Sequence, residues 1–560
     1  IVVGSQIKGA AISEALSVSV INSKDIETLG VSSADELLDF MPEQGQNFQS
    51  EAENISGGVN SARGDIGAFN LRNMGTGNTL VLLNGRRMVQ AAGYQTESVG
   101  GSYVPVNTVN SNSIPVFGVN RIEVLRDGAS AIYGADAVAG VVNTVLKSDF
   151  EGLTVRGRYD FYDNIPRDDQ RLNVEWGKFF NQGRTNLGMF FDYYHRDRVN
   201  SQDDKKWADA DFRRLIPVNS PWAGSTAFRN NSANSLYGQF DMSGSVGGIT
   251  DSRGEFETYP HGDARCEGGW YLNEVMCGHR DGQGTYRYNL NENRDLSSEL
   301  DRYNMFVYLN HEFDNGVEAY TELHYYTAKT NQFRHPAGFT SGVNLIVGAK
   351  NYYNPFGPCG SPNRLPDEII GEGFTCNGKA LLMDNYRFAE QPRIVDTENT
   401  TWRFLQGFRG SWGEWDWDGA FVWSEATRDD VTHNRISNTL MQEALNDPTP
   451  AAYNPFNGGI LLSNIDRALV DVYRKNKSDL SMVDFKVSKN EIFNLPAGPV
   501  GFLAGAEYRK ESFVDNRDPR LDGTIQFVDK DGDTYPFVSD VANSSPTGDS
   551  KGGRNVTSLF

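Results

Sequence analysis

Long apolar runs are missing from this sequence. No segment approaches the roughly 18 consecutive apolar residues that a membrane-spanning helix requires, and the mean hydropathy is −0.50. A search for apolar runs does not detect the strands of a transmembrane β-barrel, because these strands alternate lipid-facing and lumen-facing residues. The sequence therefore argues against helical membrane spans and leaves a membrane barrel open.

Basic residues are scarce. The chain has 52 Lys and Arg against 73 Asp and Glu, for a formal net charge of −21. Binding of a nucleic acid needs a basic surface, because phosphate contacts dominate its affinity. We therefore expect no nucleic-acid partner.

Catalytic motifs are also lacking. The sequence contains no HExxH zinc motif, no GxSxG nucleophile elbow and no phosphate-binding loop. We therefore expect no enzymatic activity and no required cofactor.

Cysteine is rare, with four residues in the chain. Cys266 and Cys277 lie in one Gly- and Asn-rich stretch, and Cys359 and Cys376 lie in another. This even number predicts two local disulfides in an oxidising compartment. The competing interpretation is a metal site formed by His261, Cys266, Cys277 and His279, but their spacing matches no common zinc pattern.

Aromatic residues and glycine are abundant, with 24 Tyr, 32 Phe, 9 Trp and 58 Gly. In residues 150–560, apolar and polar residues alternate over long segments, as in residues 303–313 before the hairpin signal Asp314-Asn315-Gly316. Tight turns alternate with four long polar stretches, which we expect to be loops: residues 199–298, 334–396, 431–476 and 515–553. Short turns at one end and long loops at the other are typical of an outer-membrane β-barrel.

The first 148 residues have a different, mixed pattern. Residues 23–26 and 32–38 look like helix starts, and the second carries a capping-box arrangement. Residues 79–83 form a short apolar strand that ends in an Asn-Gly turn, and residues 138–146 form another apolar run. These patterns predict a small α+β domain.

Three segments of this domain resemble one family. Residues 69–75 read FNLRNMG, residues 79–87 read TLVLLNGRR, and residues 122–143 read IEVLRDGASAIYGADAVAGVVN. They are similar to the plug motifs of TonB-dependent outer-membrane receptors. One departure is Asp127-Gly128, where many members have Gly-Pro.

The resemblance implies a domain organisation. We expect a remnant of the TonB box at residues 1–5, a plug domain at residues 6–149, and the N-terminal part of a transmembrane barrel at residues 150–560. Ile1, Val2 and Val3 would pair with the coupling protein by strand addition. The acidic start of the box and the Thr often found before its Gly are missing, and an ordinary chain terminus is the alternative.

The fold class expected is an all-β antiparallel transmembrane barrel with an α+β plug inside its lumen. The pattern contains about ten strands, whereas plugged transporters use about 22. A ten-strand barrel has no room for the plug, so we expect further strands to follow residue 560.

The resemblance also implies a function and partners. These are TonB-dependent uptake of a scarce nutrient across the Gram-negative outer membrane, coupling to the TonB–ExbB–ExbD complex, contact with outer-membrane lipid and lipopolysaccharide, and an optional surface lipoprotein. The N-terminus and plug would face the periplasm. A passive porin and a surface adhesin are the rival functions.

The nature of the ligand stays open between a ferric siderophore, an oligosaccharide, cobalamin and a peptide. Acidic loops disfavour a polyanion unless local basic clusters exist. Candidate ligand-binding residues are Tyr94, Gln95, Tyr103, Trp270 and Tyr271. The sequence Asp529-Lys530-Asp531-Gly532-Asp533 resembles the start of a calcium loop, with Asp529, Asp531 and Asp533 as ligands, but it lacks the distal Glu. A plain loop turn is the favoured interpretation there.

Overall fold

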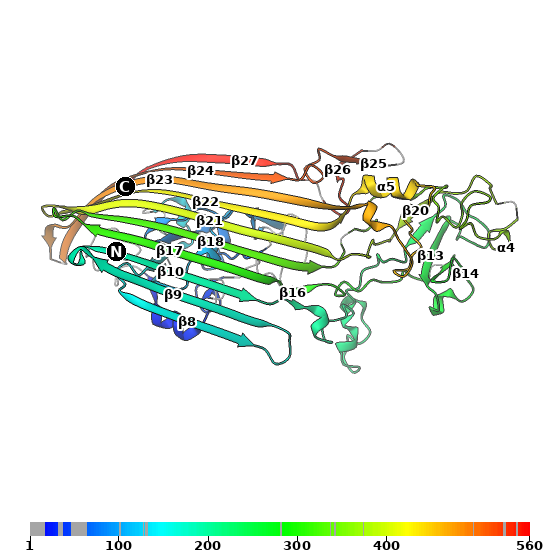
Figure 1. Ribbon diagram of the computed structural model, residues 1–560, viewed down its shortest axis with the longest axis horizontal. Helices are drawn as coiled ribbons and strands as arrows, with labels where there is room; N and C mark the ends of the chain where they lie inside the picture. The colour runs from blue at the N-terminus through cyan, green and yellow to red at the C-terminus, as the bar shows by residue number, and fades with distance from the viewer. Residues whose placement is uncertain are drawn as a thin grey trace.

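The structure is a computed structural model of residues 1–560. It describes residues 17–31, 37–45, 64–99, 102–126, 128, 133–280, 283–336, 338–340, 343–372, 374–496, 498–529, 532, 534–544 and 547–560. Three regions compose it: an N-terminal domain (residues 17–149), a long sheet, and a cap built from the connections between strands of that sheet (Figure 1).

The long sheet has ten antiparallel strands that follow one another in chain order, with β8 and β27 at its edges. Its strands are β8 (Gly152–Phe161), β9 (Asp168–Phe180), β10 (Thr185–Arg196), β17 (Glu299–Glu312), β18 (Glu318–Arg334), β21 (Arg393–Trp412), β22 (Trp415–Ile436), β23 (Leu469–Leu495), β24 (Gly498–Arg517) and β27 (Ser550–Leu559). The predicted set of ten antiparallel strands is thus confirmed, while the sheet is open and does not close into a barrel.

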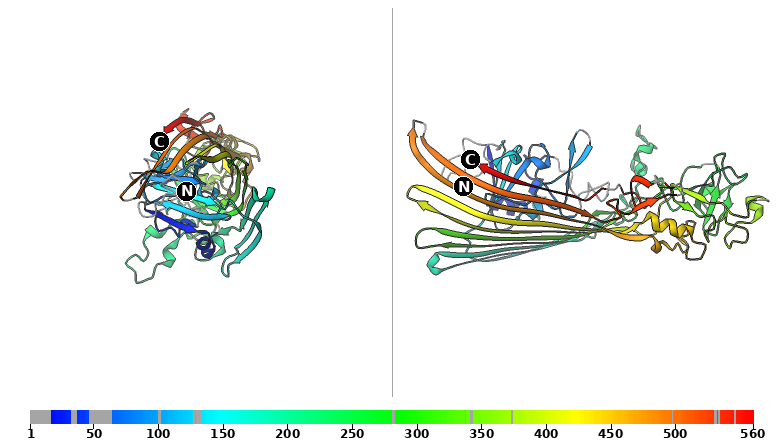
Figure 2. Two further views of the ribbon diagram at one scale, coloured as in Figure 1. Left: turned by 90° about the vertical axis from the view of Figure 1, so that its left-hand side faces the viewer. Right: turned by 90° about the horizontal axis from the view of Figure 1, so that it is seen from above.

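The two faces of the long sheet differ in character. In β17, Leu300, Arg302, Asn304 and Phe306 are buried on the face that covers the N-terminal domain. The alternate residues of the sheet point outward and include many exposed apolar side chains, among them Leu153, Val155, Leu323, Trp402, Phe421, Val483 and Phe502. Figure 2 shows the sheet curving past the N-terminal domain.

The N-terminal domain has a five-stranded mixed sheet of order β1-β6-β7-β2-β3. Its strands are β1 (Val18–Asn22), β2 (Thr79–Leu83), β3 (Arg86–Arg87), β6 (Val119–Leu125) and β7 (Gly140–Leu146), and the hairpin β4 (Gln95–Val99) with β5 (Ser102–Val106) lies apart from this sheet. The predicted helix at residues 23–26 is α1 (Ser23–Leu29), capped by Asn22 and Asp25. The second predicted helix start lies partly outside the described residues.

The cap corrects the expectation of plain loops. Its six-stranded sheet, of order β14-β15-β13-β12-β20-β19, contains β12 (Gln239–Asp241), β13 (Glu255–Pro260), β14 (Trp270–Tyr271), β15 (Met276–His279), β19 (Ile346–Val347) and β20 (Leu381–Asp384). Two helices, α4 (Asp367–Ile370) and α5 (Asn438–Asn446), and two short strand pairs lie in the same connections: β11 (Val199–Asn200) with β16 (Asp295–Ser297), and β25 (Gln526–Val528) with β26 (Thr534–Ser539). An apolar core of buried aromatic and aliphatic residues, including Phe240, Phe256, Phe356, Tyr386, Tyr453 and Phe456, holds the cap together.

The bounds of the third predicted loop shift most, because β22 and β23 run further than expected. The third loop was expected at residues 431–476, yet β22 ends at Ile436 and β23 begins at Leu469. Polar residues occupy both faces of these strand ends, as in Arg474 and Lys475, so the alternation that marks a strand is lost there. Within the described residues, no helix is long and apolar enough to cross a membrane.

Candidate functional site

The candidate site is the contact between the N-terminal domain and the long sheet. Strand β2 is buried at every position, and Asn84 and Gly85 then reverse the chain with φ of 49° and 80°. Positive φ at both positions is the mark of a tight hairpin turn. The turn places Arg86 and Arg87 opposite Leu83 and Leu82, where both arginines are 8% exposed. Buried guanidinium groups require partners.

Arg86 finds its partners on two strands of the long sheet. It lies 3.0 Å from a carboxylate oxygen of Asp418 on β22 and 2.9 Å from one of Asp484 on β23. The Tyr320 hydroxyl donates a short hydrogen bond to Asp418, and the guanidinium of Arg86 lies 5.6 Å from the centre of the Tyr320 ring. This one side chain therefore joins the domain to three strands.

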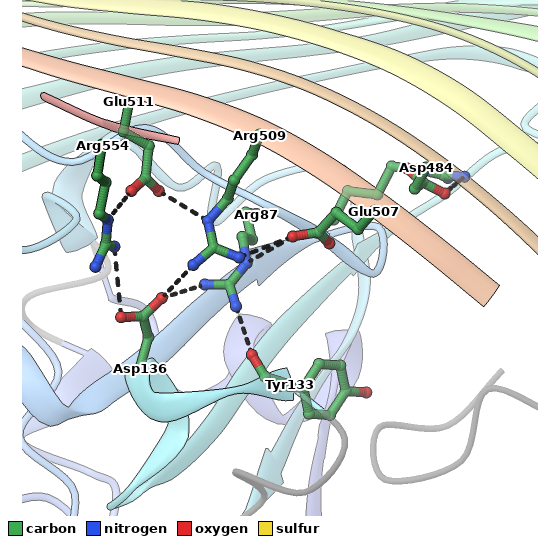
Figure 3. Close-up of polar contacts among 9 residues, drawn as sticks. Arg87, Tyr133, Asp136, Asp484, Glu507, Arg509, Glu511 and Arg554 are labelled. Atoms are coloured by element: carbon green, nitrogen blue, oxygen red, sulfur yellow. Dashed lines mark hydrogen bonds and ion pairs between the residues drawn. The ribbon is translucent and has the colours of Figure 1, made fainter. Parts of the chain in front are cut away.

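Arg87 belongs to a separate charged cluster (Figure 3). Its guanidinium contacts Asp136 of the same domain at 2.8 Å and Glu507 of β24 at 3.7 Å. Arg509 contacts Asp136 at 3.2 Å, Glu507 at 2.8 Å and Glu511 at 3.4 Å, and Arg554 of β27 closes the cluster onto Glu511 and Asp136. Three arginines and three carboxylates thus form one cluster, in which Arg87 and Asp136 come from the domain and the other four side chains from the long sheet.

Crowding of positive charge is visible in this cluster. Burial and the neighbouring Arg509 lower the pKa of Arg87, although the carboxylates of Asp136, Glu507 and Glu511 act in the opposite direction. Each arginine of the cluster contacts at least two of the three carboxylates, so no ion pair in it is exclusive.

A third contact joins Asp65 of the domain to β17 and β18. Arg302 of β17 donates two hydrogen bonds of 2.5 Å to the carboxylate of Asp65, and the Tyr326 hydroxyl donates to the same carboxylate at 2.7 Å. Burial alone would raise the pKa of Asp65, but the charge and hydrogen bonds of Arg302, with that of Tyr326, lower it below its ordinary value. The carboxylate is therefore held in its charged form.

Close packing adds an apolar contact. Gly118 has a φ of 75°, and a Cβ atom built on it would lie 2.4 Å from the ring of Phe190 on β10. Only glycine leaves room for this approach. Phe190 in turn stacks on Phe306 of β17, with ring centres 6.3 Å apart.

The contact also encloses water-sized space. One cavity of about 370 Å³ borders Arg86, Arg87, Asp484, Glu507 and Arg509, and a second of about 220 Å³ lies beside Arg86, Asp418 and Lys486. Charged groups beside such cavities can exchange a protein partner for water at a moderate cost. The arrangement can thus hold the domain firmly and still release it.

The predicted ligand-binding residues are not gathered at one place. Tyr94 packs against the long sheet, 5.4 Å from the ring of Phe513 and 4.6 Å from the guanidinium of Arg474. Gln95 and Tyr103 lie on the β4–β5 hairpin, and their side chains are outside the described structure. Trp270 is 8% exposed in the core of the cap, whereas Tyr271 is 55% exposed. Trp270 therefore packs rather than offering a surface to a ligand.

The other predicted residues have mixed outcomes. The structure pairs Cys266 with Cys277 and Cys359 with Cys376 as disulfides, so these cysteines hold no metal. Among the described residues, no group of three or more His, Cys, Asp or Glu could hold a metal ion. The TonB-box residues Ile1, Val2 and Val3 and the calcium candidates Asp531 and Asp533 lie outside the described residues, and Asp529 is buried. The TonB-box and calcium interpretations stay predictions.

No role for Arg86 or Arg87 is predicted from the sequence. One signal was available: two charged residues follow directly on the apolar strand at residues 79–83 and its turn, where burial would force them to find partners. The partners of Arg86 could not be predicted, because Asp418 and Asp484 are more than 300 residues away in the chain.

Comparison with known proteins identifies the N-terminal domain. Residues 11–141 match the family model described as the TonB-dependent receptor plug domain. The chain carries the plug of a TonB-dependent receptor. The charged clusters above are among the contacts that hold this plug to the long sheet.

Relatives match over limited lengths. The ferric enterobactin receptor PirA of Pseudomonas aeruginosa is 28% identical over 219 residues, which are 39% of this chain and 27% of that protein. The vitamin B12 transporter BtuB of Vibrio vulnificus is 31% identical over 127 residues, which are 23% of this chain and 17% of that protein. These matches span about a quarter or less of the relatives' length. A crystal structure of the ferric enterobactin receptor PfeA of Pseudomonas aeruginosa superposes with a TM-score of 0.46 at 13% identity, over 99% of this chain and 56% of that chain.

Proposed function

We propose that the protein takes up a scarce nutrient across the outer membrane of a Gram-negative bacterium by TonB-dependent transport, and that it is not an enzyme. The observation that carries the proposal is the docking of a TonB-dependent receptor plug by buried ion pairs onto one face of a sheet whose other face is apolar and exposed. Large exposed apolar surfaces mark contact with a membrane or a partner.

The outer face of the long sheet supports a position in a membrane. On β21, Trp402 and Trp412 are both exposed, and each stacks with aromatic residues of a neighbouring strand. They are roughly ten residues apart, or about 33 Å along a strand, which a tilt of about 40° reduces to the 25 Å height of a lipid-facing band. Beyond Trp402 the same face turns charged, with Glu398 and Lys329. We propose that these aromatic rows mark the two membrane surfaces.

The proposed complete protein is a barrel of about 22 strands with the plug in its lumen. The open edges at β8 and β27 support this proposal, because an exposed edge strand leaves a row of backbone groups without partners. The short turns would then face the periplasm and the cap would face outward.

In the proposed mechanism, a ligand binds on the cap side and biases the plug toward a state that exposes Ile1–Val3 to the periplasm. The TonB–ExbB–ExbD complex adds a strand at this segment and pulls on it. Force reaches the contacts of Asp65 and Arg86 in turn. Water in the cavities beside Arg86 replaces its broken ion pairs, and the plug rearranges to let the ligand pass.

For the ligand, we propose an iron chelate or cobalamin, the classes for which the relatives are named. Buried Trp270 weakens the case for aromatic stacking on an oligosaccharide, which rested partly on that residue.

Uptake by cells tests the function. Cells that express the full-length protein should accumulate labelled ferric enterobactin or cyanocobalamin, and accumulation should stop when the proton gradient is collapsed or when Ile1–Val3 are deleted. Uptake that persists without the gradient would indicate a passive porin. Ligand binding without any uptake would indicate a surface binding protein or adhesin.

A further inference from the structure

A second charged site lies in the cap, in the connection between β10 and β17. A cavity of about 380 Å³ opens where four segments of this connection meet. Its lining residues are Asp211, Arg213, Arg229, Asn231, Arg265 and residues 283–287. The volume falls within the range of small-molecule sites.

Arginine dominates this cavity, although the chain as a whole has a net charge of −21. Two of its four arginines are neutralised locally. Arg213 donates hydrogen bonds to Asp211 at 2.5 and 2.8 Å, and Arg265 donates to Asp263 at 2.8 and 2.9 Å.

The other two arginines carry unbalanced charge. Among the described residues, no carboxylate lies within ion-pair distance of Arg229 or Arg287. Arg287 donates one hydrogen bond of 2.6 Å to the backbone carbonyl of Asn231, and a carbonyl does not cancel its charge. The cavity therefore holds two positive charges in excess.

These charges are forced together. Burial lowers the pKa of Arg287, and so do the neighbouring charges of Arg229 and Arg213, while Asp211 acts in the opposite direction. An anion placed between the arginines would relieve this repulsion. Guanidinium groups pair with carboxylate and phosphate oxygens through two parallel hydrogen bonds.

The wall of the cavity is rigid. Arg265 lies 5.2 Å from the centre of the Tyr286 ring and donates a hydrogen bond of 3.2 Å to the carbonyl of Gly284. Tyr237 packs edge-on against the same ring at 4.9 Å. The Tyr286 ring is thus fixed before any ligand arrives, which lowers the entropic cost of binding.

We propose that this cavity binds an oxyanion group, a phosphate or a carboxylate, through Arg229 and Arg287, with the Tyr286 ring against the body of the molecule that carries it. Such a group comes either from a soluble nutrient or from a lipid headgroup at the outer surface. Only the outward position of the cavity rests on the proposed function. The binding chemistry stands on the cavity itself.

Binding of inorganic phosphate and of citrate to the purified full-length protein tests the proposal. Calorimetry should show saturable binding by the wild type that weakens by about tenfold for each of Arg229→Gln and Arg287→Gln, and by about a hundredfold in the double variant, since each removes a charged hydrogen bond. Arg229→Lys with Arg287→Lys should keep part of the affinity and shows that the site still folds. Arg253→Gln is the matched control, because Arg253 is an exposed cap arginine already paired with Asp251 and Glu255.

Two results would overturn the proposal: wild-type protein that binds neither anion at millimolar concentration, or a double Gln variant that binds them as the wild type does. Repeating the titration in nanodiscs with and without lipid A separates the sources. Lipid A that competes with phosphate identifies a headgroup as the occupant, and lipid A that does not compete identifies a soluble anion. No energy coupling is involved in these measurements, so a failure of transport and a failure of this site are distinguishable.

Discussion

Asp65 and Arg302 form an ion pair that is nearly closed to water, with side chains 6% and 5% exposed. The net stabilisation from such a pair is small, because desolvation offsets much of the attraction. Removal of one partner is costly, since the other charge stays buried. Removal of one partner of such a pair therefore costs more free energy of docking than the intact pair contributes.

Replacement of Asp65 by Asn tests this view of the contact. The variant leaves the Arg302 charge unpaired, and we expect it to destabilise the docked plug by about 3–5 kcal/mol. The measurement is the urea concentration at which the plug becomes susceptible to cleavage by a protease. Glu398→Gln is the control, because its partner Lys329 is exposed and the pair contributes less than about 1 kcal/mol. Equal effects of the two substitutions would contradict the claim that the buried pair is costly to break.

The lowered pKa of Asp65 predicts a dependence on pH. A carboxylate with a lowered folded pKa stabilises fully above its ordinary value of about 3.9, and this contribution is lost as the pH falls through the lowered pKa. The fraction of wild-type protein with its plug docked on the sheet should therefore decline below about pH 4. In Asp65→Asn this part of the decline should be absent, and a decline of the same size in both proteins would argue against the assignment.

At the scale of elements, the sequence predicted what local periodicity determines. The long strands and their turns were found because outward apolar and inward polar residues alternate along each of them. The cap was missed because its strands are as short as Trp270–Tyr271, too brief for any period to show. Helix α5 offered a usable signal: Ser437 caps it, and Met441, Ala444 and Leu445 share its buried side. The charged contacts and the arginine cavity form where segments distant in the sequence meet. Local sequence patterns do not predict such meetings.

The disulfides should stabilise the cap independently of the long sheet. Cys359 and Cys376 are 17 residues apart, and loss of a crosslink of this length costs about 3 kcal/mol. In a Cys359→Ser, Cys376→Ser variant, hydrogen exchange should accelerate in β20 and stay unchanged in β22. Faster exchange in β22 as well would show that cap and sheet unfold as one unit.

The outer face of the sheet gives a test of its membrane position. Phe421→Arg places a charge in the apolar band of β22 and should destabilise the protein in lipid by about 2–4 kcal/mol. Thr427→Arg on the same face of the same strand, beyond Glu425, should cost at most about 1 kcal/mol. Unfolding from lipid vesicles measures both. Similar costs at the two positions would place the membrane boundary elsewhere.

At the scale of the whole molecule, the N-terminal domain, the long sheet and the cap have different roles. The long sheet presents an apolar face to its surroundings and a mixed polar and apolar face to the plug, and the cap has an apolar core of its own at the far end of the strands. Three of the charged contacts that attach the plug are those of Asp65, Arg86 and Arg87. In chain order from the N-terminus, the contacts of Glu27, Gly30 and Val31 with β8 and β9 come first. Asp65, Arg86 and Arg87 follow in that order, so force applied at the N-terminus need not break all contacts at once.

The central claim is that the plug must move for the ligand to pass, and a reversible tether tests it most directly. A Cβ atom on Gly64 would lie 3.1 Å from the Cβ of Thr397 on β21, close to the separation of about 3.8 Å found in disulfides. A Gly64→Cys, Thr397→Cys variant would therefore tie the plug to the sheet. The φ angle of Gly64 is +80°, which strains any residue other than glycine. The amount of folded double variant in the membrane is therefore measured before uptake.

The measurement is uptake of the labelled ligand by cells before and after mild reduction, with Thr397→Cys alone as the control for the effect of the reductant. The account predicts that the oxidised double variant binds ligand normally, takes up none, and recovers uptake when the tether is reduced. Full uptake with the tether intact would contradict it.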